Sequence, residues 1–445
     1  MSTYDVIVVG SGIAGMAACL NLARGGLRVL SIEAEASEED PVGESLDWSS
    51  PDLLRALGLP MDRLIDEDIA TYKRHVILRM PDGCEQHYVP GEWLAKRPWK
   101  VNLATIHVDR RRLNQALRNL VQEAGVVTRI ARVASVESDG RHILALHTAS
   151  GERLEARWYV DASGSAAALF PRHFRLPARD YGPHKVAIWD YFEVEESVEG
   201  TTLNADQPDC EYLEWVWQIP VHPHVVSVGY VARAETIRDD RRAGRSLEEI
   251  FATQLARFPE LAAARDEKQR SGEPPTLRTT SFRCRVHNEA AGTNWLAVGE
   301  SAAMVDPMTS NGVTAALRHA EEAASLILRA HRKNKTSLPR LGTWLYSRRI
   351  AALGHFFNSG IEKVIYDWPI RRRVGIARAG DVYTIPAWLM NLVYARMRPR
   401  GALKTALYTG ITTLLRGSLS IFYWFSRRSR KSRRSASADA VCTIP

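Results

Sequence analysis

Hydrophobic and polar residues follow three successive patterns at the start of the chain. An apolar run at 4–9 leads into the turn Gly10–Gly15, apolar residues at helical spacing follow at 16–23, and a second apolar run at 27–32 ends on Glu33. Short apolar runs predict buried strands, and apolar residues that recur every three to four positions predict a helix. The chain therefore opens with a predicted β-α-β unit.

The same patterns divide the rest of the chain. Apolar runs predict further buried strands, and mixed alternation between them favours an antiparallel sheet covered on one face. These strands are predicted at 157–161, 185–195, 212–219, 225–232 and 295–298. A helix is predicted at 312–330, and helical spacing continues from residue 343. The patterns predict an α/β protein with a Rossmann-type domain, an interleaved antiparallel β-sheet domain and a mainly helical C-terminal region.

The glycines of the first turn have the spacing of a dinucleotide fingerprint. Gly10 allows the tight turn, Gly12 lets a pyrophosphate approach the backbone, and Gly15 lets the helix pack closely on the strand. The phosphates would lie at the helix N-terminus, where free N–H groups favour negative charge. Glu33, 18 residues after Gly15, is placed to accept hydrogen bonds from a ribose. A bound dinucleotide is therefore expected.

The net charge of +8, from 59 basic and 51 acidic residues, is unevenly distributed. Eleven basic residues and no acidic one lie between Arg396 and Arg434, so the remainder carries 48 basic and 51 acidic residues, a net −3. An enzyme that binds nucleic acid would carry basic residues around its working face. We therefore expect no nucleic-acid partner.

Cysteine usage and the start of the chain suggest a reducing compartment. The five cysteines are widely scattered, and no pair has metal or redox spacing, so no metal site is predicted. The first strand begins within five residues of Met1, which leaves no room for a signal peptide ahead of it. A cytoplasmic location is the expectation.

Four motifs in order resemble the glutathione-reductase-type flavoproteins, such as the single-component aromatic hydroxylases. They are Gly10–Gly15 with Glu33, Asp109-Arg110, Asp161–Gly164 and Gly299-Glu300. The resemblance implies FAD as the cofactor, with the late glycine–acid pair near the ribityl chain. Glu300 stands where that superfamily usually has Asp. The chain has no second glycine fingerprint, so a separate flavin reductase is expected to supply reduced flavin.

Two further motifs narrow the resemblance to the flavin-dependent halogenases, in the phenol and pyrrole branch. Trp215–Pro220 looks like their Trp-x-Trp-x-Ile-Pro motif, and Asp306–Gly312 is similar to the loop that they place against the flavin. In that family, reduced flavin and oxygen convert chloride or bromide to hypohalous acid. The resemblance places the halide at the backbone of Asn311 and Gly312, where N–H donors suit an anion. Thr309 stands where tryptophan halogenases carry Glu, which argues against free tryptophan as the substrate.

The resemblance implies roles for individual residues. Lys73 matches the lysine that delivers the electrophile, as a hydrogen-bond donor or a transient haloamine. Trp215, Trp217, Ile219 and Pro220 would line the flavin side of the substrate tunnel. The expected cofactor-binding residues are Gly10, Gly12, Ile13, Ala14, Gly15, Glu33, Glu44, Ser45, Arg110, Gly299, Glu300 and Pro307.

The predicted domains follow from these assignments. Segments 1–70, 101–180 and 281–335 form the FAD-binding domain, 71–100 and 181–280 the β-rich substrate domain, 336–426 the helical region, and 427–445 a basic disordered tail.

Purely structural interpretations of the tryptophans and of Lys73 stay open. Paired tryptophans on one strand face also occur in an ordinary core, and most lysines lie at the surface. The function expected is halogenation of an electron-rich aromatic ring, either free, lipid-soluble or bound to a carrier protein. The alternatives are an aromatic hydroxylase, an isoprenoid-type reductase and a non-catalytic flavoprotein.

The C-terminal region has two interpretations. Ala402 to Phe425 is apolar but interrupted by Lys404 and Arg416, which is too polar for a membrane span. Ile421–Phe425 is followed by six basic residues between Arg427 and Arg434. Such a segment fits an interfacial anchor on the inner face of a membrane, or a lid helix followed by a disordered basic tail.

Overall fold

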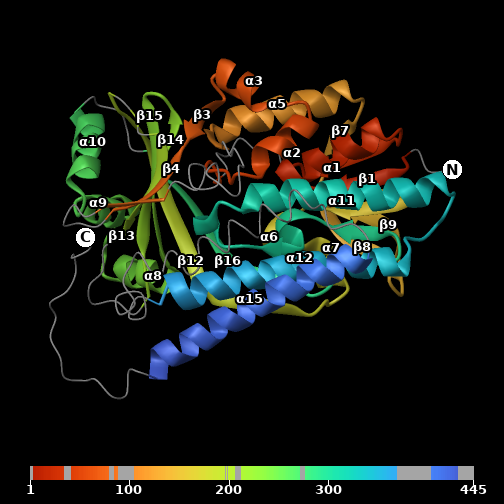
Figure 1. Ribbon diagram of the computed structural model, residues 1–445. Helices are drawn as coiled ribbons and strands as arrows, with labels where there is room; N and C mark the ends of the chain where they lie inside the picture. Colours follow the sequence, from red (N-terminus) through yellow and green to blue (C-terminus); the bar gives the residue numbers. More distant parts are fainter. Residues whose placement is uncertain are drawn as a thin grey trace, which may run out of the picture.

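A five-stranded parallel sheet forms one half of the computed structural model, which describes residues 4–34, 42–79, 85–88, 105–195, 197, 199–205, 212–270, 276–367 and 402–428. Its strands, in spatial order, are β17 (Trp295–Ala297), β11 (Trp158–Asp161), β1 (Val6–Val9), β2 (Val29–Glu33) and β7 (Val127–Ile130). Helices α1 (Ile13–Arg24), α5 (Arg110–Glu123) and α11 (Gly312–Arg332) lie beside it (Figure 1). The central strands are entirely buried, as parallel strands covered on both faces must be. The predicted Rossmann-type unit is confirmed.

An eight-stranded sheet forms the other half. Its order is β18 (Ala303–Met304), β16 (Arg278–His287), β12 (Ala178–Glu193), β15 (Val225–Arg233), β14 (Trp215–His222), β13 (Gly200–Ala205), β4 (His75–Arg79) and β5 (Glu85–Tyr88). The pairs are antiparallel except β13 with β4, which is parallel. These two strands are distant in sequence, so no hairpin constrains their direction. β16 and β18 join this sheet although they lie partly or wholly in the segment 281–335 predicted for the other domain.

Both faces of the large sheet are buried along its central strands β14 and β15, so the prediction of a single covered face is wrong. Along β14, Val216 packs into a core with α8 (Ala234–Arg242), α9 (Leu247–Leu255) and α10 (Pro259–Arg270). Trp215, Trp217 and Ile219 point to the opposite face and join the core shared with the parallel sheet. Alternation on this strand therefore separates two apolar faces, because the other half of the molecule covers the second one.

Small elements join the two halves. Among the described strands, β3 (Ala70–Lys73) pairs with β6 (Thr105–Val108) in a two-stranded sheet. A separate sheet contains β8 (Val133–Asp139), β9 (His142–Thr148) and β10 (Arg153–Leu154). The short helices are α2 (Ser50–Ala56), α3 (Met61–Asp66), α6 (Gly164–Ala167) and α7 (Leu169–His173), with 3₁₀ turns η1 (Gly299–Ser301) and η2 (Pro307–Thr309).

Beyond residue 340, the described segments are mainly helical, as predicted. α12 (Arg340–Gly360) continues into a π-helical turn, η3 (Ile361–Ile365), and α15 (Ala402–Arg428) lies along α12 (Figure 1). Of the predicted basic tail, residues 429–445 lie outside the described part of the chain.

Candidate active site

The glycine turn between β1 and α1 leaves an open space above its backbone. Gly10 has φ +100°, and a Cβ there would lie 2.3 Å from the carbonyl oxygen of Ala162. A Cβ on Gly15 would lie 1.9 Å from the carbonyl oxygen of Gly10. Gly12 is exposed, and no atom lies within 4 Å of the position that its Cβ would occupy. Two of the glycines are therefore required by packing, and the third leaves room for a phosphate at the N-terminus of α1.

Glu33 holds the same turn from the end of β2. Its Oε2 accepts hydrogen bonds from the backbone N–H of Ser11 at 2.7 Å and from Ser11 Oγ at 2.6 Å. A carboxylate offers about four lone-pair positions, so Glu33 can still accept from a ribose. The residue fits its expected role and also fixes the shape of the glycine turn.

Arg110 approaches this region from the start of α5. Its Nη1 donates to the carbonyl oxygens of Val42 at 2.7 Å and Gly43 at 3.0 Å, whereas its buried Nε has no hydrogen-bond partner. Burial lowers the pKa of Arg110 to about 10, against the opposing effect of Glu44 and Glu300. A buried cationic donor without an acceptor fits an anionic group of a bound dinucleotide.

The late glycine–acid pair lies directly against the early glycine turn. Gly299 has φ +59°, and a Cβ there would come within 2.7 Å of the Cβ of Ala14, which follows the buried Ile13. Glu300 is exposed and accepts a hydrogen bond from Ser165 Oγ at 3.1 Å. Motifs almost 300 residues apart thus meet at the carboxyl ends of β1 and β17, where a nucleotide is expected in a parallel sheet. The residues present fit FAD.

The loop from Asp306 to Gly312 enters the long helix α11. Asp306 caps the η2 turn by accepting from the backbone N–H of Met308, Pro307 begins that turn, and Ser310 has φ +55°. The strained Ser310 turns the chain so that α11 begins at Gly312, which is exposed. The first N–H groups of a helix have no acceptor within it, and the helix dipole favours an anion there. The backbone at Asn311 and Gly312 can therefore hold a halide.

Lys73 is buried one hydroxyl group away from that loop. Its Nζ donates to Ser45 Oγ at 2.8 Å and to the carbonyl oxygen of Leu46 at 2.9 Å. Ser45 Oγ in turn accepts from Ser310 Oγ at 3.1 Å. The predicted lysine, the predicted Ser45 and the predicted halide loop therefore form one hydrogen-bonded cluster.

The surroundings of Lys73 favour a neutral amine. The side chain is 3% exposed, and burial lowers its pKa to about 7, against the weaker effect of the Asp47 carboxylate. Asp47 is itself bound by Thr314 Oγ1 at 2.7 Å, and the Trp48 ring lies 5.2 Å from the Lys73 nitrogen. The lowered pKa brings the unprotonated amine, which is the nucleophilic form, within reach near neutral pH.

Two buried residues extend this cluster and have no sequence motif. Thr201 Oγ1 bonds to Ser45 Oγ at 2.7 Å and to His107 Nε2 at 2.9 Å. Burial lowers the pKa of His107 well below its usual value, so the ring is neutral. The sequence offered one signal for His107: it is a polar residue in the strand 105–108, whose positions are all buried. A chain of hydrogen bonds thus leads from the lysine to a neutral imidazole.

The tryptophan motif forms a wall beside the lysine cluster. Trp215 and Trp217 are buried on one face of β14 with ring centroids 6.0 Å apart, and a Cβ on Gly229 would lie 2.1 Å from the Trp217 ring. Trp217 pairs across the sheet with Leu203, which lies two positions after Thr201. Trp217, Leu203 and Thr201 therefore share one face of the sheet. Ile219 lies on that face too. The carbonyl oxygen of Pro220 accepts a hydrogen bond at 2.6 Å from Oγ1 of Thr71, a residue that lies two positions before Lys73.

Glu44 lies beside Ser45 and is buried. Tyr191 Oη donates to its Oε1 at 2.7 Å, and burial raises the pKa of Glu44 to about 7. Its carboxyl group is therefore held near Arg110, whose charge partly opposes the effect of burial.

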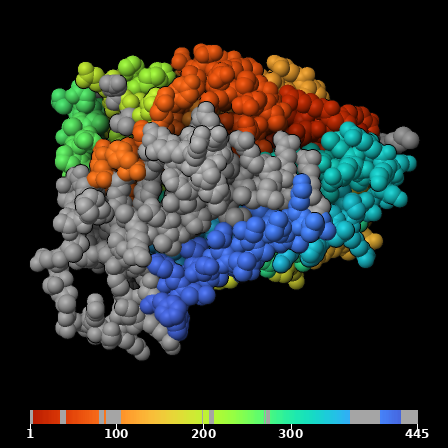
Figure 2. Space-filling model, viewed as in Figure 1, coloured from red at the N-terminus to blue at the C-terminus, as the bar shows by residue number. Residues whose placement is uncertain are grey.

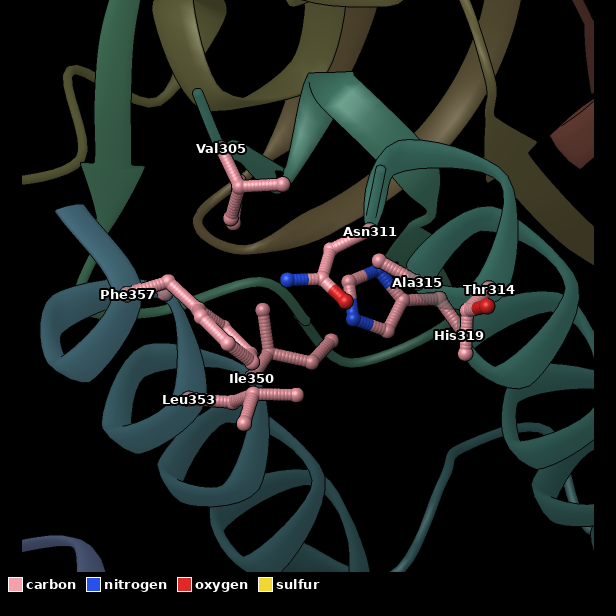
Figure 3. A pocket seen from close by; sticks show the side chains of 10 residues that line it. Val305, Asn311, Thr314, Ala315, His319, Ile350, Leu353 and Phe357 are labelled. Carbon is pink, nitrogen blue, oxygen red and sulfur yellow. The ribbon is translucent and has the colours of Figure 1, made fainter. Parts of the chain in front are cut away.

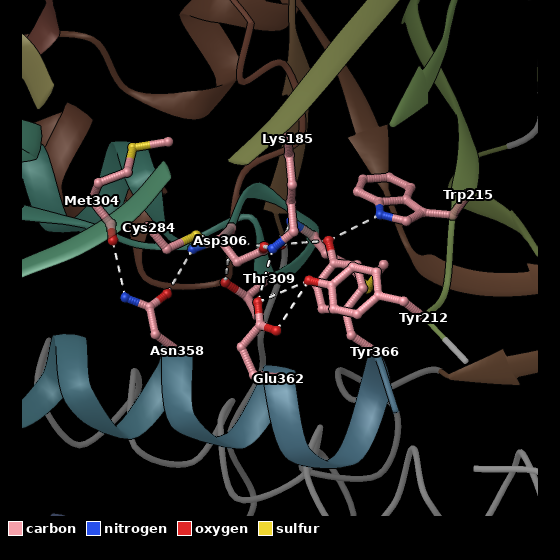
Figure 4. Close-up of polar contacts among 11 residues, drawn as sticks. Lys185, Tyr212, Trp215, Cys284, Met304, Asp306, Thr309, Asn358, Glu362 and Tyr366 are labelled. Carbon is pink, nitrogen blue, oxygen red and sulfur yellow. Dashed lines mark hydrogen bonds and ion pairs between the residues drawn. The ribbon is translucent and has the colours of Figure 1, made fainter. Parts of the chain in front are cut away.

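A buried ion cluster that the sequence did not reveal holds the other end of the halide loop. Lys185 Nζ lies 2.8 Å from Asp306 Oδ2 and 2.9 Å from Glu362 Oε1. Tyr366 Oη donates to Asp306 Oδ1 at 3.1 Å and accepts from Trp215 Nε1 at 3.1 Å (Figure 4). The cluster therefore connects the loop, the tryptophan motif and the end of α12.

A small, mostly apolar pocket lies between α11 and α12, behind the halide loop (Figure 3). The side chains of Asn311 and His319 point into it among Val305, Ile350 and Phe357. Burial lowers the pKa of His319 to about 3, so its imidazole is neutral. The pocket adds no charge beside the loop.

Family models match both halves of this site. The tryptophan halogenase model matches residues 94–338, more than half of the 445 residues, and an FAD-binding domain model matches residues 5–90. The solved flavin-dependent brominase Bmp2 shares the fold at 19% identity and a TM-score of 0.66, over 96% of this chain and 100% of that one. Halogenase PltM has a TM-score of 0.69 at 16% identity, over 98% of this chain and 93% of that one.

Curated relatives are similar in sequence over most of this chain. Tryptophan 2-halogenase of Chondromyces crocatus is 28% identical over 342 residues, which cover 73% of this chain and 61% of that protein. The 1H-pyrrole-2-carbonyl peptidyl-carrier-protein chlorinase of Pseudomonas fluorescens is 24% identical over 75% of this chain and 78% of its own length. The chain thus spans about three fifths of the first of these relatives. FAD as cofactor and the resemblance predicted from the motifs are confirmed: the chain belongs to the tryptophan halogenase family.

Proposed function

We propose that this protein uses reduced FAD, oxygen and a halide to halogenate an electron-rich phenolic or pyrrole-like ring. The observation that carries the proposal is the buried Lys73 amine, one hydroxyl group from the loop where a halide fits. Bound reduced flavin would supply the activated oxygen that oxidises halide to hypohalous acid. A separate flavin reductase would supply the reduced cofactor.

The neutral amine of Lys73 provides the second half of the chemistry. Its nitrogen attacks the halogen of hypohalous acid, the halogen–oxygen bond breaks, and water leaves with the amine proton. The ring carbon of the substrate then takes the halogen from nitrogen, and the ring proton returns to the amine. The pKa of about 7 keeps the amine available for this exchange at neutral pH. The two tryptophans would separate the flavin from the substrate.

The loop supports a substrate other than free tryptophan. Thr309 Oγ1 donates back to the carbonyl oxygen of Asp306 at 2.9 Å, so this position offers no carboxylate to the lysine cluster. A relative named for a pyrrole bound to a peptidyl carrier protein is consistent with a carrier-bound ring. A free or lipid-soluble phenol has the same electron-rich chemistry, and the experiment below separates these sources.

Mass spectrometry of reaction products tests the proposal. Purified protein with FAD, a flavin reductase and either chloride or bromide is incubated with free phenols, free pyrroles and carrier-bound pyrrole. A halogen isotope pattern in any product supports the proposal, and the incubation in which it forms identifies the substrate. An oxygenated or reduced product that forms equally without halide would instead identify a hydroxylase or a reductase. Reoxidation of flavin without any product would identify a non-catalytic flavoprotein.

A further inference from the structure

Helix α15 packs on the body of the protein with only one of its faces. Tyr408 and Leu419 on that face are buried, and Arg349 Nη1 of α12 donates to Thr405 Oγ1 at 2.9 Å. Lys363 Nζ donates to Ser420 Oγ at 2.7 Å near the other end. The contact with α12 and η3 therefore runs along most of the helix.

The opposite face of α15 is apolar and exposed. Large apolar side chains recur there at intervals of four, seven, seven and four residues, which places them on one side of a helix with 3.6 residues per turn. They are Leu403, Leu407, Leu414, Ile421 and Phe425, with Trp424 at the edge. Leu403 is 84% exposed and Leu414 is 72% exposed. We call this row the α15 stripe; it is about 33 Å long.

No charged side chain interrupts the α15 stripe. By helical position, Lys404 lies to one side of the row and Arg416 lies on the opposite face of the helix, whereas Gly410 and Gly417 fill the gaps within the row. Figure 2 shows α15 as a continuous ridge on the molecular surface. Contiguous apolar surface of this extent marks an interaction site in a protein that folds in water.

Charge identifies the kind of partner. In the sequence, the stripe ends in Trp424 and Phe425 and is followed by six basic residues between Arg427 and Arg434. No acidic residue occurs between Arg396 and Arg434. Aromatic side chains settle at a membrane interface, and basic residues beside them attract anionic headgroups. Among the described helices, none is long and apolar enough to cross a membrane.

We propose that α15 lies flat on an anionic lipid surface, with the α15 stripe in the headgroup region, and that the basic residues next in the sequence favour anionic lipid. The face of α15 held by α12 cannot enter the membrane, so the helix binds without spanning. This inference is independent of the halogenase proposal, because it uses none of the residues of the candidate active site.

Vesicle flotation with the full chain tests the proposal. Vesicles of phosphatidylcholine alone are compared with vesicles containing phosphatidylserine, for wild type, Leu414→Gln/Ile421→Gln and the control Ala402→Gln/Thr413→Gln. The control places the same side chains at exposed positions beside the stripe. We expect wild type and control to float with the anionic vesicles. The affinity of the stripe variant for these vesicles should be lower by about tenfold or more. Unchanged thermal unfolding of the stripe variant shows that its fold is intact.

Three outcomes would overturn the proposal. Equal flotation of the stripe variant and the control would remove the stripe from the interaction. Failure of wild type to float with anionic vesicles would exclude the lipid surface as the partner. A wild-type dimer in light scattering that the stripe variant loses would identify a second copy of the chain as the true occupant.

Discussion

Two buried lysines near opposite ends of the loop Asp306–Gly312 have opposite charge behaviour. Lys73 is 3% exposed and Lys185 is 1% exposed. Lys73 donates to a hydroxyl and a carbonyl, and burial lowers its pKa to about 7. Burial also acts on Lys185, but the carboxylates of Asp306 and Glu362 outweigh it and raise the pKa well above its usual value. Similar burial therefore yields a titratable amine in one place and a fixed cation in the other.

The two clusters belong to one loop. Asp306 at its start binds Lys185, and Ser310 near its end contacts Ser45, which binds Lys73. The fixed cation can hold the loop against β12 and η3, while the titratable amine faces the end that would hold the halide. The partners of a buried lysine, more than its burial, decide whether it is suited to chemistry or to structure.

Loss of the Lys73 amine should have the largest effect. In Lys73→Met we expect halogenation to fall about 1,000-fold, because a nucleophile and proton carrier is removed. Release of hypohalous acid, measured with a small-molecule trap, should continue. Lys363→Met is the matched control, since that lysine donates to Ser420 outside the site. Full halogenation by Lys73→Met, with normal activity of the control, would exclude the proposed role.

Loss of the Lys185 cation should affect stability most. Lys185→Met leaves the buried Asp306 and Glu362 carboxylates without their cation, which should cost about 3–5 kcal/mol of unfolding free energy. Denaturant unfolding measures this cost. Lys73→Met should not be destabilised in the same way, because burying the Lys73 amine already disfavours its charged form.

A double variant separates charge from packing. Lys185→Met/Glu362→Gln removes one of the two unpaired carboxylates and should recover part of the stability lost in Lys185→Met. If Lys185→Met and Lys73→Met proved equally stable, the contrast between the two lysines would be wrong.

The sequence predicts those parts of the site that depend on backbone geometry. Gly10, Gly15 and Gly299 lie where a Cβ would clash or where φ is positive, so only glycine fits and the motif is readable. The tryptophan motif and the halide loop are similarly fixed by local spacing. These motifs identified most of the residues that the structure brings together.

Residues that act through long-range contacts escaped prediction. Lys185, Glu362 and Tyr366 meet Asp306 only because β12, α12 and η3 converge there, and nothing in their local sequence indicates a partner. Thr201 and His107 join the Lys73 cluster for the same reason. The second covered face of the large sheet also depends on how the two halves pack.

The pH dependence of halogen transfer is the smallest effect and the sharpest test of the contrast. The folded-state pKa of Lys73 lies near 7, below the usual lysine value of 10.5, so the neutral amine is lost as pH falls through 7. Product formed per hypohalous acid released should therefore fall about tenfold for each pH unit well below 7. This ratio removes the pH dependence of oxygen activation from the comparison. A ratio that rises as pH falls would mean that the protonated lysine acts, as a hydrogen-bond donor to hypohalous acid. Lys185, a cation throughout this range, should contribute nothing to the profile, because its carboxylate partners hold its proton.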